Sequence, residues 1–210
     1  MKNYVITVAR GFGSGGKQIA VALGKELGIP CYERQILTMA SQKSGINENL
    51  FAEVDEKLRG SYLTKMLTSV PNVNIIEPSE KGFTSDNNLY KIQCEIIKSL
   101  ARTESCIIVG KCADYVLKEY PNVISVYIEA PRVDCVRSIM EKMSVTEEEA
   151  HRLIRKTDKY RASYYKYYTH GGEWTNPVNY DMTLNSARIG REKCVKVIKD
   201  YIKTKFDIEQ

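Results

Sequence analysis

Glycines at positions 11, 13, 15 and 16, followed by Lys17, form the stretch of this sequence with the clearest chemical meaning. Glycine lets the backbone curl so that several N–H groups point at one anion. An apolar segment at 4–9 precedes this stretch, and Ile19 begins a helical apolar pattern after it. A helix N-terminus adds unpaired N–H donors and a positive dipole end, and a lysine can reach the outer phosphates. Residues 10–18 therefore predict a cradle for a polyphosphate.

This cradle departs from the Walker A pattern at one position. Gly11 and Gly16 have the Walker A spacing before Lys17, but Gln18 replaces the Ser or Thr whose hydroxyl holds magnesium. The amide oxygen of Gln18 is a weaker substitute. A second register centres the loop on Gly13-Ser14-Gly15 and puts Gly16 at the lysine position. A glycine-rich turn without a ligand is the alternative to both registers.

Residues 151–170 are a second candidate, because the positive charge of the chain concentrates there. The whole chain has a net charge of +5, and this segment alone has the same value. Its charged residues are Arg152, Arg155, Lys156, Asp158, Lys159, Arg161 and Lys166. Asp158 can orient Arg155 or Arg161 through a bidentate pair on a helix. Arginines held in this way suit a transferring phosphoryl group, and a solvated helix face is the ordinary alternative.

Helices and strands are expected to alternate along the chain. The expected strands cover 4–9, 30–32, 105–109, 122–129 and 181–184. The expected helices cover 15–27, 33–43, 47–58, 88–102, 112–119, 131–143, 146–168 and 191–205, with a long loop over 69–88. Thr146 and Glu149 have the spacing of a capping box. Strands separated by helices predict a parallel sheet of five strands in the α/β class.

Polar residues follow four of these strands at the point where each ends. Residues 10–17 follow the first strand, Glu33 and Arg34 the second, Lys111 the third and Arg132 the fourth. Ligands of parallel sheets bind outside the carboxyl ends of the strands. We therefore expect these residues to share one site.

Composition limits the class of protein. The 210 residues suffice for one domain, and no apolar run approaches the roughly 20 residues of a membrane helix. The N-terminus leads directly into a strand, so we expect a cytoplasmic protein without a membrane partner. Six scattered cysteines lack zinc spacing and suit a reducing compartment. The tyrosines at 160, 164, 165, 167 and 168 are expected to pack in the interior, since base stacking needs exposed rings.

The run from Val8 to Lys17 resembles the start of the cytidylate kinase-like family, a branch of the P-loop nucleoside monophosphate kinases. Further similarity covers 31–34, 107–111, 122–124, 147–159, 164–165 and 180–181. The resemblance spans almost the whole chain and is weakest over 60–90. It implies a P-loop NTPase-type three-layer α/β/α fold with a helical acceptor-binding insertion and a mobile lid. The implied boundaries are 35–102 for the insertion and 151–175 for the lid, within a single domain of 1–210.

The resemblance also implies roles for the residues at matching positions. The residues implied to bind the ATP phosphates are Gly11, Gly13, Ser14, Gly15, Gly16, Lys17 and Gln18. Those implied to bind the acceptor are Glu33, Arg34, Lys111 and Asp181. Asp181 matches an aspartate near the pyrimidine of cytidylate kinases, and a turn residue is its alternative reading. Lys111 replaces an arginine of the family and lacks its planar fork.

Three departures from the family pattern bear on how magnesium would be held. They are Gln18 in place of a hydroxyl residue, Gly11 in place of glutamate, and Val109 in place of an acid. Glu33 is the nearest alternative carboxylate for a metal or an acceptor hydroxyl. It can equally be an acid in the first turn of a helix.

Three hypotheses about function follow. The main one is an ATP- and Mg²⁺-dependent phosphotransferase for a small phosphorylated acceptor such as CMP, with Lys17, Arg155, Asp158 and Arg161 as catalytic residues. The second is a nucleotide-binding module that no longer transfers phosphate, which Gln18 motivates. The third, nucleic-acid binding through the basic helix, is the least expected, because the net charge is modest. The 191–205 helix would permit a homodimer.

Overall fold

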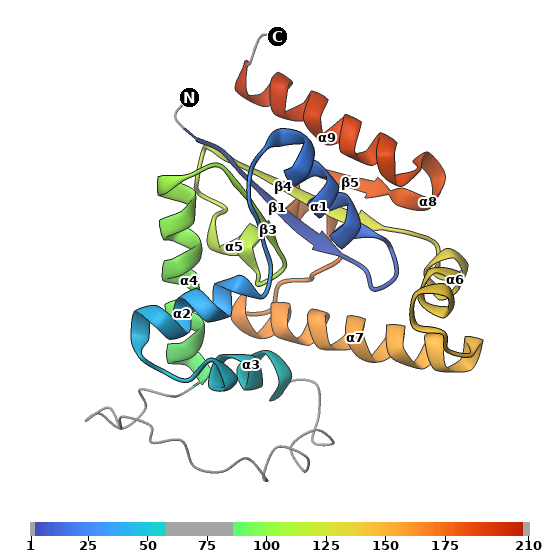
Figure 1. Cartoon of the computed structure of the whole chain (residues 1–210), viewed down its shortest axis with the longest axis horizontal. Coiled ribbons are helices and arrows are strands. Elements are labelled where there is room, and N and C mark those ends of the chain that lie inside the picture. The colour runs from blue at the N-terminus through green and yellow to red at the C-terminus, as the bar shows by residue number, and fades with distance from the viewer. Residues whose placement is uncertain (1–2, 58–85, 208–210) are drawn as a thin grey trace.

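A five-stranded parallel sheet forms the centre of the computed structural model, which describes residues 3–57 and 86–207 (Figure 1). The strand order is β2-β3-β1-β4-β5. The strands are β1 (Val5–Arg10), β2 (Cys31–Tyr32), β3 (Cys106–Val109), β4 (Val123–Glu129) and β5 (Met182–Asn185). The predicted α/β fold with five parallel strands is confirmed.

Alternation along the strands assigns their side chains to two apolar layers. Val5 and Ala9 of β1 belong to one buried cluster, whereas Ile6 and Val8 belong to another. Successive side chains of a strand point to opposite faces of the sheet. Both faces are covered by helices, and this is why the central strands are nearly continuous apolar runs.

Two helices cover one face of the sheet. Helix α1 (Gly16–Leu27) and helix α9 (Arg191–Phe206) pack on each other and lie side by side in Figure 1. Ile19 and Leu23 of α1 and Ile198 of α9 are fully buried between them and the strands. The short helix α8 (Ser186–Ile189) leads into α9.

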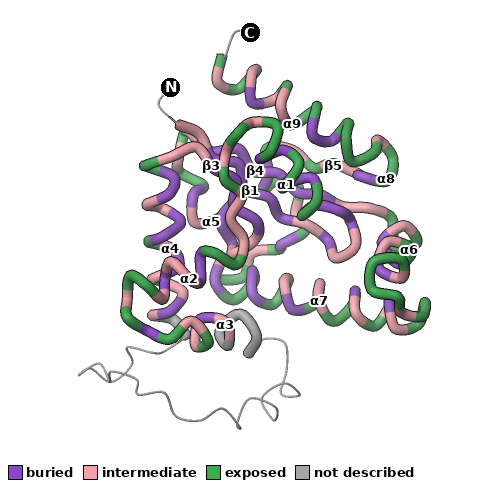
Figure 2. Tube along the Cα trace, in the orientation of Figure 1, coloured by how far each residue is buried: buried purple, intermediate pink, exposed green. Residues whose placement is uncertain are grey.

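The opposite face carries the other helical elements of the N-terminal half. They are α2 (Gln35–Ser44), α3 (Glu48–Lys57), α4 (Asp86–Thr103) and α5 (Ala113–Val116). Helices α2, α3 and α4 pack on one another, and Figure 2 shows buried positions along α2 and α4. Most of the expected loop at 69–88, and part of the expected insertion at 35–102, lie outside the described residues. The acceptor-binding role of this region stays a prediction.

Helices α6 (Arg132–Met143) and α7 (Glu147–Tyr168) pack together beyond β4. The hydroxyl of Thr146 accepts a hydrogen bond from the N–H of Glu149 and caps α7 as predicted. Four of the five tyrosines of α7 are buried, and Tyr167 is exposed. The expectation that they pack is confirmed for those four. A short 3₁₀ helix, η1 (Pro177–Asn179), leads to β5.

Over residues 3–57 and 86–207, no helix is long and apolar enough to cross a membrane.

Candidate active site

The predicted phosphate loop joins β1 to α1 and has the backbone shape that its glycines allow. Gly13 has a φ of 94° and Gly15, the N-cap of α1, has a φ of 81°. These values lie in the left-handed region that strains other residues. A Cβ at Gly13 would also lie 2.7 Å from the backbone oxygen of Cys135. The loop therefore requires glycine at this position for two independent reasons.

Hydrogen bonds from three other segments fix the loop. The Gly11 N–H donates to the carbonyl of Ile128 at 3.0 Å, which ties the loop to β4. The Ser186 hydroxyl donates to the carbonyl of Ser14 at 2.5 Å. The Phe12 N–H donates to Asp158 Oδ1 of α7 at 2.9 Å. The loop is thus held in place without a ligand.

Glu129, the last residue of β4, occupies the space beside Gly11. A Cβ at Gly11 would lie 2.6 Å from Glu129 Oε2. Tyr127 donates its hydroxyl to that oxygen at 2.7 Å, and the Ala130 N–H donates to the other oxygen at 2.9 Å. The absence of a side chain at position 11 therefore makes room for a carboxylate from another strand.

Lys17 and Arg10 are both paired with Glu33. Lys17 Nζ lies 2.5 Å from Glu33 Oε2, and Arg10 Nη2 lies 2.8 Å from Glu33 Oε1. Burial alone would raise the pKa of Glu33, but the hydrogen bond from Lys17 and the charge of Arg10 outweigh it and lower the pKa. Glu33 is therefore ionised at neutral pH, and its carboxylate takes the position beside Lys17 that a phosphate would need.

Helix α7 contacts the loop through Asp158 and Arg161. Arg161 donates to the backbone carbonyl of Arg10 at 2.9 Å and to Asp158 at 3.4 Å, and it lies over the Phe12 ring at 5.6 Å. Burial raises the pKa of Asp158 to about 6, although the N–H of Phe12 and the charge of Arg161 oppose that shift. Asp158 acts here as a link between α7 and the loop.

A cavity of about 220 Å³ opens over the phosphate loop. Its lining includes Gly13, Gly15, Gly16, Lys17 and Gln18, together with residues of α6 and α7. These predicted phosphate-binding residues are therefore brought together. The glycine conformations, the helix N-terminus and Lys17 fit the polyphosphate of a nucleotide.

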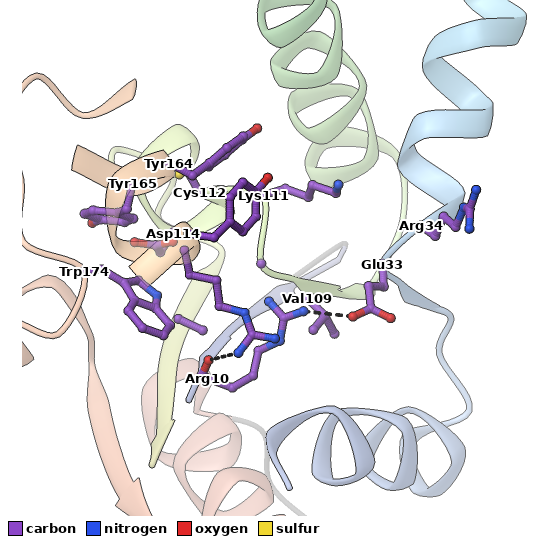
Figure 3. Close-up of a pocket in the computed structure, with 14 residues that line it drawn as sticks. Arg10, Glu33, Arg34, Val109, Lys111, Cys112, Asp114, Tyr164, Tyr165 and Trp174 are labelled. Carbon is purple, nitrogen blue, oxygen red and sulfur yellow. Dashed lines mark hydrogen bonds and ion pairs between the residues drawn. The ribbon is translucent and has the colours of Figure 1, made fainter. Parts of the chain in front are cut away.

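A second cavity, of about 260 Å³, lies at the carboxyl ends of β1, β2 and β3 (Figure 3). Its predicted lining residues are Glu33, Arg34, Lys111 and Arg161. Burial, and then the charge of Arg10, lowers the pKa of Lys111 to about 7. An anion bound beside Lys111 would favour the charged ammonium and raise this pKa.

The two cavities share one wall. Arg10, Glu33 and Arg161 line both of them. Gly110, which has a φ of 76°, leaves room for the Arg10 guanidinium at this wall. Two ligands that filled the cavities would therefore meet at two arginines and one carboxylate.

Two predicted site residues lie elsewhere. Asp181 directly precedes β5, at the amino end of that strand, where it accepts a hydrogen bond from the Ser125 N–H and pairs with Lys205 at 2.8 Å. The cavities at the carboxyl ends do not include it. Arg155 is exposed on α7 and lines neither cavity, so its role as a lid arginine stays a prediction.

Sequence reasoning missed several residues of the site. Asp114 and Trp174 line the second cavity, and Glu129 lies against the loop. Glu129 ends an expected strand, and this position could have revealed it. Asp114 and Trp174 follow no such rule, because Asp114 lies within α5 and Trp174 lies in the segment between α7 and η1, where it packs on Tyr127 of β4.

Two oxygen ligands for Mg²⁺ are present around the loop cavity. Glu33 borders both cavities and Gln18 borders the loop cavity, so a carboxylate and an amide oxygen stand near the donor phosphates. Mg²⁺ in such sites keeps several waters and needs one or two protein oxygens besides phosphate. Within the described residues, no group of three or more His, Cys, Asp or Glu gathers to hold a metal.

Comparison with known proteins places the chain in a family. The model of the cytidylate kinase-like family matches residues 5–188, and the chain belongs to this family. An uncharacterized protein from Eubacterium ventriosum has a similar structure, with a TM-score of 0.70 at 24% identity over 96% of this chain and 99% of that one. A shikimate kinase from Bacteroides thetaiotaomicron gives a TM-score of 0.49 at 12% identity over 95% and 98% of the two chains. The search of the curated proteins finds no match.

Proposed function

We propose that this protein is an ATP-dependent phosphotransferase that acts on a small phosphorylated acceptor, with CMP as the first candidate. Family membership supports a nucleotide-dependent kinase of small molecules as the general class. The observation that carries the proposal is the shared wall of Arg10, Glu33 and Arg161 between the loop cavity and the second cavity. A donor phosphate over the loop and an acceptor in the second cavity would meet there.

The charged residues that line the two cavities have roles that follow from their positions. Lys17 and the loop N–H groups hold the donor phosphates once Lys17 leaves Glu33. Arg161 borders both cavities and stabilises the charge that spreads over the transferring group. Lys111 binds the anionic group of the acceptor. Bound Mg²⁺ would neutralise the donor phosphates, with Glu33 and Gln18 as the protein oxygens.

Phosphoryl transfer from ATP with Mg²⁺ tests the proposal. The acceptors are CMP, dCMP, UMP, AMP and GMP, and Lys17→Ala is the inactive variant. We expect transfer to at least one acceptor and a loss of about a thousandfold in Lys17→Ala, because a phosphate-binding charge is removed. Lys25→Ala, exposed on the same helix, is the matched control. A fully active Lys17→Ala variant would contradict the assigned site.

A nucleotide-binding module without transfer is the second candidate function. Two observations favour it, namely Gln18 at the magnesium-ligand position and the pairing of Lys17 with Glu33. This candidate predicts that ATP raises the melting temperature while no product forms with any acceptor. Nucleic-acid binding through α7 has less support, because four of its five tyrosine rings are buried.

A further inference from the structure

Glu129 is a charged residue that contacts the phosphate loop but lines neither of the two cavities. It is the last residue of β4, the strand beside β1, and its carboxylate lies against Gly11. The proposed transfer gives Glu129 no contact with either ligand. A carboxylate near bound phosphates is repelled by them, so we asked what its contact with the loop provides.

Gly11 differs from the other glycines of the loop in why a side chain does not fit there. Gly13 and Gly15 have positive φ values, whereas Gly11 does not. The backbone at position 11 is therefore compatible with alanine. The obstacle is the carboxylate of Glu129, since its Oε2 would lie 2.6 Å from an added Cβ and its Oε1 closer still. Glycine has the greatest backbone freedom, so the fixed position of Gly11 depends on its neighbours.

The carboxylate of Glu129 is itself held on both oxygens. The Tyr127 hydroxyl donates to Oε2 at 2.7 Å, and the N–H of Ala130 donates to Oε1 at 2.9 Å. The ring of Tyr127 is fixed in turn, because it packs edge-on against Trp174 at 5.6 Å and stacks on Tyr180 at 5.2 Å between ring centroids. The carboxylate is therefore a firm support for Gly11.

The backbone of Glu129 reaches the other end of the same turn. Its carbonyl oxygen lies 3.2 Å from the hydroxyl of Ser186, which donates to the carbonyl of Ser14. The hydroxyl of Ser14 donates to the carbonyl of Gly11 at 2.9 Å and closes the turn. Gly11 and Gly13 of this turn line the loop cavity. Glu129 thus supports both ends of a turn that borders the place for the donor phosphates.

We infer that Glu129 is a positioning residue of the donor site, whose carboxylate holds Gly11 in the conformation that receives the phosphates of ATP. The inference rests on the proposed function, since it takes the phosphate loop as the ATP site. Glu129 acts through the loop and does not contact the reacting atoms. A loop that is already fixed in its bound shape loses less conformational entropy when a ligand binds, and this raises affinity.

Equilibrium binding of ATP to Gly11→Ala, Glu129→Ala and the double variant tests this inference. We expect each single variant to bind ATP about tenfold more weakly than wild type, because the added methyl group displaces the carboxylate and the truncation removes it. The losses should not add in the double variant, since both changes break one contact. Glu119→Ala, whose side chain is 85% exposed, is the matched control. Wild-type affinity in Glu129→Ala, or additive losses in the double variant, would overturn the inference.

Two conservative variants separate positioning from a general loss of folding. Glu129→Gln keeps the shape of the side chain and an accepting oxygen, so it should bind ATP within about threefold of wild type. Tyr127→Phe removes only the hydroxyl that holds the carboxylate and should weaken ATP binding about threefold. A Glu129→Gln variant as weak as Glu129→Ala would contradict a role that depends on shape.

The same binding measurements separate this inference from the proposed function. ATP affinities that follow the expected pattern, in a protein that transfers phosphate to no acceptor, would keep the role of Glu129 and reject the transferase. Phosphoryl transfer by wild type, together with unchanged ATP affinity in Glu129→Ala, would keep the transferase and reject the role of Glu129.

Discussion

The two ends of the site differ in how their charged groups are satisfied. Around the phosphate loop the charged groups contact one another, because Glu33 pairs with both Lys17 and Arg10, and Asp158 accepts from the loop and from Arg161. At the other end of the second cavity, which Asp114, Tyr165 and Trp174 line, one Asp114 oxygen is buried and has no hydrogen-bond partner among the described residues. The phosphate loop must break internal contacts to admit a ligand, whereas this oxygen has no internal contact to break.

The largest effect is expected where the loop has no freedom to adjust. Gly13→Ala should abolish nucleotide binding and lower the free energy of unfolding by about 2 kcal/mol or more, because it combines a strained φ with a backbone clash. Gly28→Ala, with a positive φ and open space around it, should cost about 1 kcal/mol and leave binding intact. Urea unfolding and ATP titration measure both. Similar losses in the two variants would show that the clash is relieved by movement of the loop.

Arg161 lies on the face of α7 that contacts the phosphate loop, and Arg155 lies on the exposed face. Substitution of each tests which face takes part in the reaction. Arg161→Ala should lower kcat about a hundredfold while the Kd for ATP changes little, because the guanidinium lies at the wall where charge is transferred. Arg155→Ala should lower kcat by a smaller factor. Steady-state kinetics with the preferred acceptor give the comparison. A larger loss in Arg155→Ala would mean that α7 moves on binding and brings Arg155 into the site.

Glu33→Gln tests the internal pairing directly. Removal of the carboxylate breaks the ion pair of Lys17 with Glu33, so Lys17 can bind phosphate without losing that pair. ATP without Mg²⁺ should therefore bind about three- to tenfold more tightly. Turnover with Mg²⁺ should fall if Glu33 also supports the ion. Glu48→Gln, which lies 3.9 Å from Arg34 and outside both cavities, is the matched control. Unchanged ATP affinity in Glu33→Gln would mean that the pair with Lys17 does not compete with phosphate.

The last effect concerns the pH dependence of stability at Asp114. Burial raises the pKa of Asp114 from 3.8 to about 6, so the folded chain binds more protons than the unfolded chain between these values. The contribution of Asp114 to the free energy of unfolding therefore falls as pH rises through this range and stays low above it. Asp114→Asn should raise the free energy of unfolding by roughly 1 to 3 kcal/mol more at pH 8 than at pH 4.5. Thermal unfolding at the two pH values measures this difference. A gain independent of pH would contradict a buried ionised carboxylate.

The fold could be predicted because its signals are local. The three central strands are short apolar runs between turns, and the hydroxyl of Thr146 caps the start of α7. Even there the prediction was incomplete, because the Glu149 carboxylate pairs with Arg152 instead of completing the capping box. A solvent-exposed acid has several neighbours within reach, and the sequence does not rank them.

Site residues could be predicted from the sequence only where they lie close after a strand. Lys17 lies at the start of the helix that follows β1, Glu33 directly follows β2, and the two side chains pair. Arg155 and Arg161 are six residues apart, so they differ by about 120° around a helix and cannot share one face. Asp181 precedes β5, at the amino end of that strand, and lines neither of the two cavities. Asp114 joins the site through contacts between distant segments, which no local pattern records.

The shared wall of Arg10, Glu33 and Arg161 has a thermodynamic consequence. Glu33 borders both cavities and pairs with Arg10, which also borders both, so occupation of one cavity alters the electrostatic field in the other. Binding linkage is reciprocal: whatever factor the donor nucleotide imposes on acceptor affinity, the acceptor imposes equally on the donor. The apparent Kd for each ligand therefore depends on the concentration of the other, and both concentrations must be stated when a Kd is given.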